Sequence, residues 1–85
     1  MLFVYILYSK SKKKFYSGQT LDLDRRLVEH NNGKTPSIKH GIPWEMVWKT
    51  IVGDRKEAVI LETKIKKRGA KRFLDDLKTS GSRGA

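Results

Sequence analysis

The fold is decided by the segment Leu2-Phe3-Val4-Tyr5-Ile6-Leu7-Tyr8. Its residues are β-branched, aliphatic or aromatic, and they show no period of 3.6, so the segment predicts a strand rather than a helix. No charged side chain interrupts the run, which is typical of a strand that is buried on both faces. We therefore expect residues 2–8 to form the central strand of a sheet.

A second strand is predicted directly after the first. Residues 9–14 are polar and include four lysines, as suits a hairpin loop, and Phe15–Thr20 then regains strand character. A loop of about six residues makes the pair antiparallel, because a parallel crossover needs a dozen or more. Gly18 stands inside this strand, where glycine often marks a close approach by backbone or ligand.

A helix and a third strand follow. Asp22 is a good N-cap for a helix over residues 23–31, which ends before Gly33. Residues 34–43 have no periodicity and contain two prolines, so they predict a loop. Trp44–Val52 resumes strand character, and alternation places Trp44, Met46 and Trp48 on one face.

Two further helices complete the chain. Asp54 and Glu57 resemble a capping box at the start of a helix that ends near Arg68, and Ala70–Leu77 predicts a short third helix. The order β-β-α-β-α-α predicts an α+β fold, a three-stranded antiparallel β-sheet flanked by three α-helices. We expect one domain over residues 1–79 and a flexible C-terminal tail over residues 80–85.

Composition narrows the classes of function. The chain has 85 residues with 19 Lys+Arg against 9 Asp+Glu, a net charge of +10 and no cysteine. The missing cysteines exclude a disulfide scaffold, a Cys-ligated zinc site and a thiol nucleophile. The charge favours a polyanionic partner, nucleic acid rather than a membrane. Because no apolar run approaches the roughly 20 residues of a membrane span and no secretory leader is evident, we expect a cytoplasmic protein.

Ionisable residues interrupt the apolar stripes of the two longer helices. In each helix, positions i, i+3, i+4 and i+7 form the side that should face the core. These positions are occupied by Leu23, Arg26, Leu27 and His30 in the first helix, and by Ala58, Leu61, Glu62 and Ile65 in the second.

Two interpretations account for these charged positions. A charge on a packed side costs several kcal/mol unless it is paired or lies in a solvated cleft. Arg26 and Glu62 could form a partly buried salt bridge. Alternatively, an arginine, a histidine and a carboxylate that converge on one sheet have the composition of a phosphodiester hydrolysis site. In that case we expect Arg26, His30, Glu62, Tyr5 and Tyr16 to line one concave face.

The order of these motifs resembles the GIY-YIG nuclease domain, in particular its small stand-alone bacterial members. The resemblance covers Phe3 to about Leu77. The sequence departs from the family pattern at Phe3, Val4 and Ser17, and no asparagine follows Asn32. The matching motifs are Val4-Tyr5-Ile6, Tyr16-Ser17-Gly18, Asp22–Leu27 with His30 and Asn31, Pro43-Trp44, and a helix that carries Glu62.

The resemblance implies a divalent-metal-dependent endonuclease that hydrolyses DNA phosphodiester bonds, with a role in DNA repair, recombination or processing. It implies that Tyr5, Tyr16, Arg26, His30 and Glu62 are catalytic and that Glu62 anchors Mg²⁺ or Mn²⁺, shared with a substrate phosphate. Arg26 would bind the phosphate through its planar guanidinium. Tyr16 is the family's candidate for the general base, and His30, which titrates near neutral pH, is a chemical rival. The sequence leaves this choice open.

The remaining basic residues predict an interface with low sequence specificity, because no base-reading motif is present. The expected substrate is DNA, double- or single-stranded, with RNA left open. We expect the protein to be a monomer, and a protein partner could direct it to its target. Two alternatives stay open: a nucleic-acid-binding module with little turnover and a basic ribosome-associated protein. The expected phosphate-binding residues are Lys12, Lys13, Lys14, Lys66, Lys67, Arg68, Lys71 and Arg72.

Overall fold

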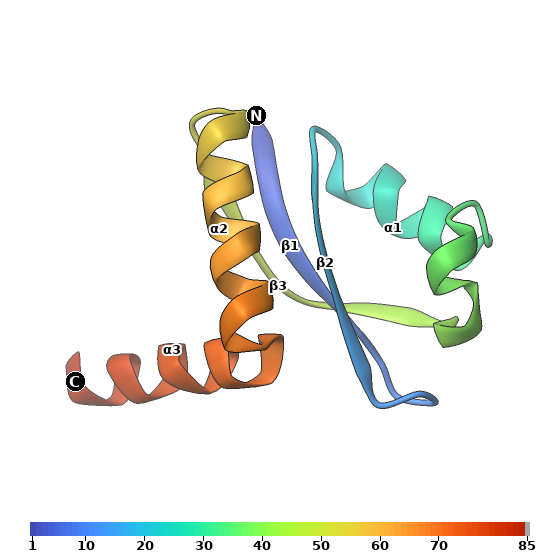
Figure 1. The fold of residues 1–85 in the computed structure, drawn as a ribbon. Coiled ribbons are helices and arrows are strands. Elements are labelled where there is room, and N and C mark those ends of the chain that lie inside the picture. Colours follow the sequence, from blue (N-terminus) through green and yellow to red (C-terminus); the bar gives the residue numbers. More distant parts are fainter. Residues whose placement is uncertain (85) are drawn as a thin grey trace.

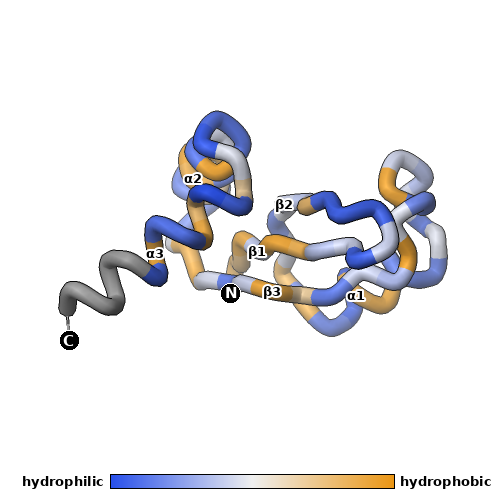
Figure 2. Tube along the Cα trace, turned by 90° about the horizontal axis from the view of Figure 1, so that it is seen from below, coloured by the Kyte–Doolittle hydropathy of each residue, from blue (hydrophilic) through white to orange (hydrophobic). Residues whose placement is uncertain are grey.

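Three strands form one antiparallel sheet in the computed structural model, which describes the backbone of residues 1–84 and the side chains of residues 1–78. They are β1 (Leu2–Ser9), β2 (Lys14–Thr20) and β3 (Trp44–Val52), in the order β2-β1-β3. The run of apolar residues in β1 lies between its two neighbours (Figure 2). The predicted central position of this segment is therefore confirmed, as is the antiparallel hairpin.

The helices lie on both sides of this sheet. They are α1 (Leu23–Asn31), α2 (Arg55–Arg68) and α3 (Ala70–Gly84), with a 3₁₀ helix η1 (Pro36–Gly41) between α1 and β3. Helices α1 and α2 stand on opposite sides of the strands, and α3 turns away from the end of α2 (Figure 1). The predicted α+β architecture with three α-helices is confirmed.

Alternation along β1 divides the apolar residues into two clusters. Val4 and Ile6 pack with Ala58 and Ile65 of α2 and with Phe73 of α3. On the opposite face, Tyr5 and Leu7 pack with Trp44, and Leu23 and Leu27 of α1 cover them. The side chains of a central strand point alternately to the two faces, so one strand supplies both clusters.

A β-bulge in β3 corrects one sequence expectation. Opposite β1, Leu7 pairs with Met46 but Ile6 pairs with Trp48, so the strand gains one extra residue, Val47. An extra residue reverses the side to which the following side chains point. Met46 therefore packs in the cluster under α1 and Trp48 in the cluster under α2, so the prediction that they share a face is wrong.

Two segment boundaries also differ from expectation. The predicted loop over residues 34–43 contains η1, which begins at Pro36, a residue whose fixed φ suits a first helical turn. Helix α3 continues through Gly84 instead of ending at Leu77, so residues 80–84, expected to form a flexible tail, are helical. No proline interrupts this stretch, and a glycine in a helix costs only about 1 kcal/mol. Residue 85 lies outside the described residues, and flexibility of the tail remains a prediction.

Candidate active site

Tyr5 and Gly18 are direct cross-strand partners in the β1–β2 pair. A Cβ atom on Gly18 would lie 2.6 Å from the Tyr5 hydroxyl oxygen and 2.8 Å from Cζ, which no real side chain permits. The Tyr5 ring can therefore lie across β2 only because position 18 has no side chain. This close contact explains why a glycine stands within β2. The group that approaches Gly18 is the Tyr5 side chain of the neighbouring strand β1.

His30 joins Tyr5 to the loop after α1. The Tyr5 hydroxyl oxygen lies 2.8 Å from Nε2 of His30, and Oγ1 of Thr35 lies 2.9 Å from Nδ1. His30 is 0% exposed and Tyr5 is 1% exposed. Because both ring nitrogens are hydrogen-bonded inside the protein, His30 is placed to hold Tyr5 rather than to meet a solvent molecule.

The surroundings favour the uncharged forms of both residues. Burial lowers the pKa of His30, the charge of Arg26 lowers it further, and Glu29 opposes this change. Burial likewise raises the pKa of Tyr5, against a hydrogen bond from Arg26 that lowers it. The histidine is therefore neutral and the Tyr5 hydroxyl keeps its proton near pH 7.

Arg26 reaches the same cluster from α1. The interaction with the Tyr5 hydroxyl raises the pKa of Arg26 most. Burial opposes this effect and lowers the pKa, and Glu29 raises it further. Nη1 lies 3.4 Å from Oε1 of Glu29, and the Arg26 side chain is 38% exposed. The partner of Arg26 is thus Glu29 on its own helix, and the alternative of a salt bridge between Arg26 and Glu62 is wrong.

Tyr16 lies beside this network with its hydroxyl unengaged. Its ring meets His30 edge-on at 5.3 Å between centroids and lies 6.3 Å from the ring of Trp44. The side chain is half-buried. Among the described residues no hydrogen-bond partner is found for its hydroxyl, so that group can take up a water molecule or a substrate atom.

Glu62 comes to the site from the other face of the sheet. Its Oε2 accepts a hydrogen bond of 2.9 Å from Nε2 of Gln19, whose Oε1 accepts one of 3.2 Å from Arg55. Gln19 follows Gly18 in edge strand β2 and therefore points to the α2 side. Glu62 still acts on Tyr5, because its charge raises the pKa of that residue.

The expected shared face therefore needs a correction for Glu62. Four of the five predicted catalytic residues lie on the α1 side of the sheet: Tyr5, Tyr16, Arg26 and His30. Glu62 belongs to the helix that covers the other side. The two sides meet around β2, an edge strand, at Gly18 and Gln19.

Three neighbours of the site could not be found from residue patterns. Thr35 binds His30, and Gln19 and Arg55 extend from Glu62. Thr35 stands in an aperiodic segment, and Gln19 contacts a residue 43 positions away. Only the three-dimensional arrangement joins them to the site.

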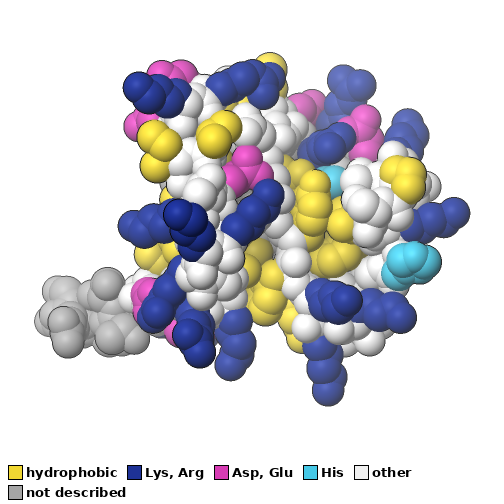
Figure 3. All heavy atoms as spheres, viewed as in Figure 1, with side chains coloured by type: hydrophobic (Ala, Val, Ile, Leu, Met, Phe, Trp, Pro, Cys, Tyr) yellow, Lys and Arg dark blue, Asp and Glu magenta, His cyan; other side chains and the backbone are white. Residues whose placement is uncertain are grey.

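The predicted phosphate-binding residues are all exposed. Lys and Arg side chains surround a central strip of hydrophobic side chains on the face between α2 and α1 (Figure 3). Lys12, Lys13 and Lys14 lie at the β1–β2 turn, and the others lie at the α2–α3 junction. Arg68 is engaged in an ion pair, with Nε 2.8 Å from Oδ2 of Asp76.

Glu62 is the single acidic residue that the predicted site offers to a metal ion. The described part of the chain contains no cluster of three or more histidine, cysteine, aspartate or glutamate residues that could hold one. A lone, half-buried carboxylate does not make a protein cage. It suits a hydrated Mg²⁺ or Mn²⁺ ion that shares its remaining positions between water and a substrate phosphate.

Comparison with known proteins agrees with the fold. The family model described as the GIY-YIG catalytic domain matches residues 1–74. A UPF0213 protein of Photorhabdus laumondii is 36% identical over 64 residues, which are 74% of this chain and 61% of that protein. The match thus spans less than two thirds of the relative's length. No solved structure matches. Among the described residues, no helix has the length and apolar character needed to cross a membrane.

Proposed function

Because the chain belongs to the GIY-YIG nuclease family, we propose that it is a divalent-metal-dependent endonuclease that hydrolyses DNA phosphodiester bonds with low sequence specificity. The observation that supports this best is the group of Tyr5, His30 and Arg26, with the Tyr16 hydroxyl beside it and Glu62 reaching β2 from the opposite side. A binding surface alone needs no carboxylate whose charge acts on this cluster, as that of Glu62 acts on Tyr5.

Arg26 binds the scissile phosphate in this proposal. Its guanidinium is partly exposed and is held by Tyr5 and Glu29, so its direction is set before the substrate arrives. A planar guanidinium can donate to two phosphate oxygens and stays charged at any physiological pH. It stabilises the added negative charge as the bond to phosphorus forms, which accelerates the reaction more than it strengthens binding.

Tyr16 is the general base that the geometry favours. Its phenolate oxygen accepts a proton from the attacking water, whose oxygen bonds to phosphorus while the bond to the 3′ oxygen breaks, and the departing 3′ oxygen takes up a proton from solvent. His30 is unsuited to this role because both of its nitrogens are engaged with Tyr5 and Thr35. We assign His30 as a positioning residue that fixes Tyr5, and Tyr5 as the contact that orients Arg26.

Glu62 holds the divalent ion, with Gln19 and Arg55 fixing the carboxylate. Nucleases of this family generally depend on such an ion. When bound, the ion supplies Lewis-acid stabilisation of charge on the phosphate and on the departing oxygen. The Gln19 amide donates a hydrogen bond to Oε2 of Glu62 and so fixes the orientation of the carboxylate. The other carboxylate oxygen, Oε1, then stays available to the ion.

A nucleic-acid-binding module with little turnover is the second candidate. The observation that favours it is the lone carboxylate among the potential metal ligands of the described residues. Both candidates predict salt-sensitive DNA binding, and only the first predicts hydrolysis.

Cleavage of DNA by the purified protein separates the two candidates. Supercoiled plasmid and single-stranded DNA are incubated with Mg²⁺, with Mn²⁺, or with chelator. The nuclease predicts nicked or shortened DNA in either metal and intact DNA in chelator. DNA that stays intact in all three conditions, while it is bound, supports the binding module.

A further inference from the structure

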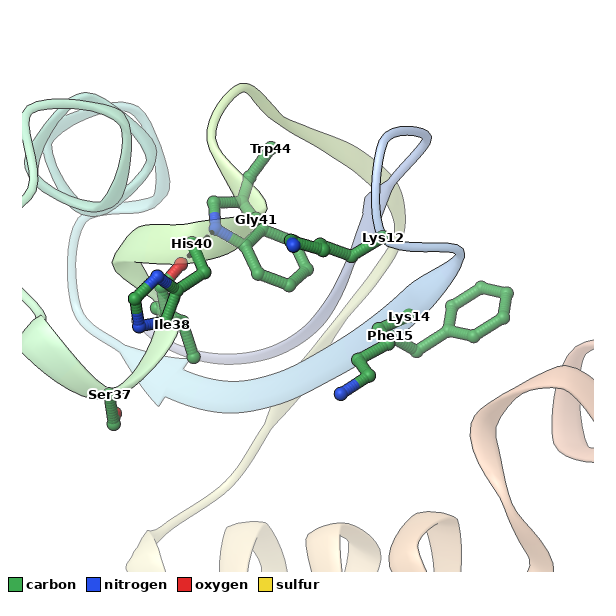
Figure 4. Close-up of a pocket in the computed structure, with 8 residues that line it drawn as sticks. All are labelled: Lys12, Lys14, Phe15, Ser37, Ile38, His40, Gly41 and Trp44. Carbon is green, nitrogen blue, oxygen red and sulfur yellow. Dashed lines mark hydrogen bonds between the residues drawn. The ribbon is translucent and has the colours of Figure 1, made fainter.

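A pocket adjoins the proposed catalytic residues. It has a volume of about 300 Å³ and lies between the β1–β2 turn and η1, with Lys12, His40 and Trp44 among the side chains that line it (Figure 4). Its lining consists of Lys12, Lys14, Phe15, Ser37, Ile38, His40, Gly41 and Trp44.

Trp44 connects this pocket to the catalytic cluster. The Trp44 ring lines the pocket and also lies 6.3 Å from the ring of Tyr16, measured between centroids. Lys14 and Phe15 precede Tyr16 directly in β2. A ligand in the pocket is therefore a close neighbour of Tyr16, the proposed general base.

The apolar wall of the pocket is held rigidly. Nε1 of Trp44 donates a 2.8 Å hydrogen bond to the carbonyl oxygen of Ile38. The Asn31 side chain donates to the Trp44 carbonyl oxygen through Nδ2 and accepts from the Trp44 backbone N–H through Oδ1. A Cβ atom on Gly41 would clash with the indole ring of Trp44, so the η1 backbone packs directly against that ring. A wall with such constraints is formed before any ligand binds.

The opening of the pocket is cationic. Lys12 and Lys14 are exposed there, and none of the eight lining residues is acidic. Apolar side chains within and cations at the opening complement a ligand that has a flat apolar body and an attached anion. A nucleotide has this construction, and the volume lies at the small end of the range of about 300–1,000 Å³ for ligand pockets.

We propose that this pocket binds one unpaired nucleotide of the DNA substrate next to the scissile bond. The base lies against Ile38 and the small exposed part of Trp44, a residue that is 6% exposed, and its phosphate lies between Lys12 and Lys14. A base that is stacked within a duplex cannot enter a pocket, so the substrate is single-stranded at this position. This inference rests on the proposed function, since it names the kind of DNA that the same site accepts.

Binding of a small probe tests the pocket directly. A 5′-phosphorylated thymidine dinucleotide is titrated into the ¹⁵N-labelled protein with chelator present, so that no cleavage occurs. The inference predicts a shift of the Trp44 indole N–H signal and no shift for Trp48, which packs against Phe73 on the other face. Inorganic phosphate should not move the Trp44 signal. A Trp44 signal that stays still at dinucleotide saturation overturns the inference.

Abasic DNA tests the contribution of the base. Single-stranded oligonucleotides with and without consecutive abasic positions carry the same phosphates, and contact of one base with aromatic side chains is expected to strengthen binding about tenfold. In Lys12→Ala both oligonucleotides should bind more weakly, because both carry the phosphate that Lys12 contacts. Lys10→Ala is the matched control, because Lys10 lies in the same turn and does not line the pocket. Equal affinity of the wild-type protein for both oligonucleotides contradicts the pocket.

The two proposals fail in different ways. If DNA is cleaved but abasic and normal oligonucleotides bind alike, the endonuclease stands and the nucleotide pocket is wrong. If the dinucleotide shifts the Trp44 signal but no condition gives cleavage, the pocket stands on a protein that only binds DNA.

Discussion

The hydroxyl oxygen of Tyr5 lies 2.8 Å from Nε2 of His30, although 25 residues separate them in the sequence. On its other side His30 binds Thr35, and the Tyr5 hydroxyl also meets Arg26. The contacts form a buried connection from the loop after α1 to an arginine at the surface. The direction of the guanidinium is therefore controlled from inside the protein.

Arg26→Ala should impair DNA binding and cleavage together. The guanidinium is proposed to contact the phosphate both before and during the reaction, so cleavage should fall by about 10²–10³-fold, more than affinity falls. The measurements are fluorescence anisotropy with labelled DNA and the initial rate of plasmid nicking.

Arg25→Ala is the matched control for this substitution. Arg25 is the neighbouring arginine and also pairs with Glu29, but its side chain is 76% exposed. It carries the same charge and has no contact with Tyr5 among the interactions of the described residues. An equal loss of cleavage in both variants would mean that only net charge matters.

Gly18→Ala should destabilise the protein and displace Tyr5. The added methyl group would meet the Tyr5 hydroxyl oxygen at 2.6 Å, so either the ring or the strand must shift. Such overpacking costs about 1–3 kcal/mol of unfolding free energy. Chemical denaturation measures this loss, and the cleavage rate of the folded fraction should also decrease. Ser17→Ala, on the opposite face of β2, is the comparison, and equal stability of the two variants would contradict the packing argument.

Stability should decline as the solution becomes acidic. The pKa of His30 is lowered in the folded protein by burial and by Arg26, whereas an unfolded histidine has a pKa of about 6.5. Below about pH 6.5 the histidine of the unfolded chain takes up a proton that His30 of the folded protein does not. The contribution of neutral His30 to the free energy of unfolding is therefore complete above about pH 6.5 and is lost as the pH falls. Thermal melting between pH 5 and pH 8 measures it. The pH dependence should weaken in His30→Gln and persist in His40→Gln, and the reverse pattern would contradict the assignment.

Salt should weaken DNA binding strongly and alike for different sequences. Each phosphate contact contributes about 0.9 to the slope of log affinity against log salt concentration. Replacing Lys12, Lys13 and Lys14 together by alanine should reduce that slope by about 2–3. Titrations at several salt concentrations measure it, and an unchanged slope would exclude the β1–β2 turn from the interface.

The fold was largely predictable because its signals are local. The apolar segment of β1, the N-caps Asp22 and Asp54 and the Gly69 break each act within a few residues, and the structure has each where it was expected. The bulge at Val47 was not predictable, because it arises from the pairing with β1 rather than from the strand's own residues.

The candidate site was predictable to the extent that its residues break an apolar pattern. His30 is a buried polar residue in the stripe of α1, and Glu62 interrupts that of α2. The pattern did not show which face of the sheet each helix covers, so it did not show that Glu62 comes from the helix on the face opposite α1. Thr35 and Gln19 carry no pattern of their own, because any threonine in a loop or glutamine in an edge strand looks the same in sequence.

The most direct test of metal-dependent hydrolysis at Glu62 is the rate of DNA cleavage by Glu62→Gln in Mg²⁺, compared with Glu45→Gln. Glu45 is exposed and pairs with Lys10, so its substitution removes the same charge away from the site. We expect Glu62→Gln to lose at least about 100-fold in rate while DNA affinity and melting temperature stay near those of the wild-type protein. Glu45→Gln should cleave normally. Cleavage by Glu62→Gln at the wild-type rate would contradict the role of this carboxylate.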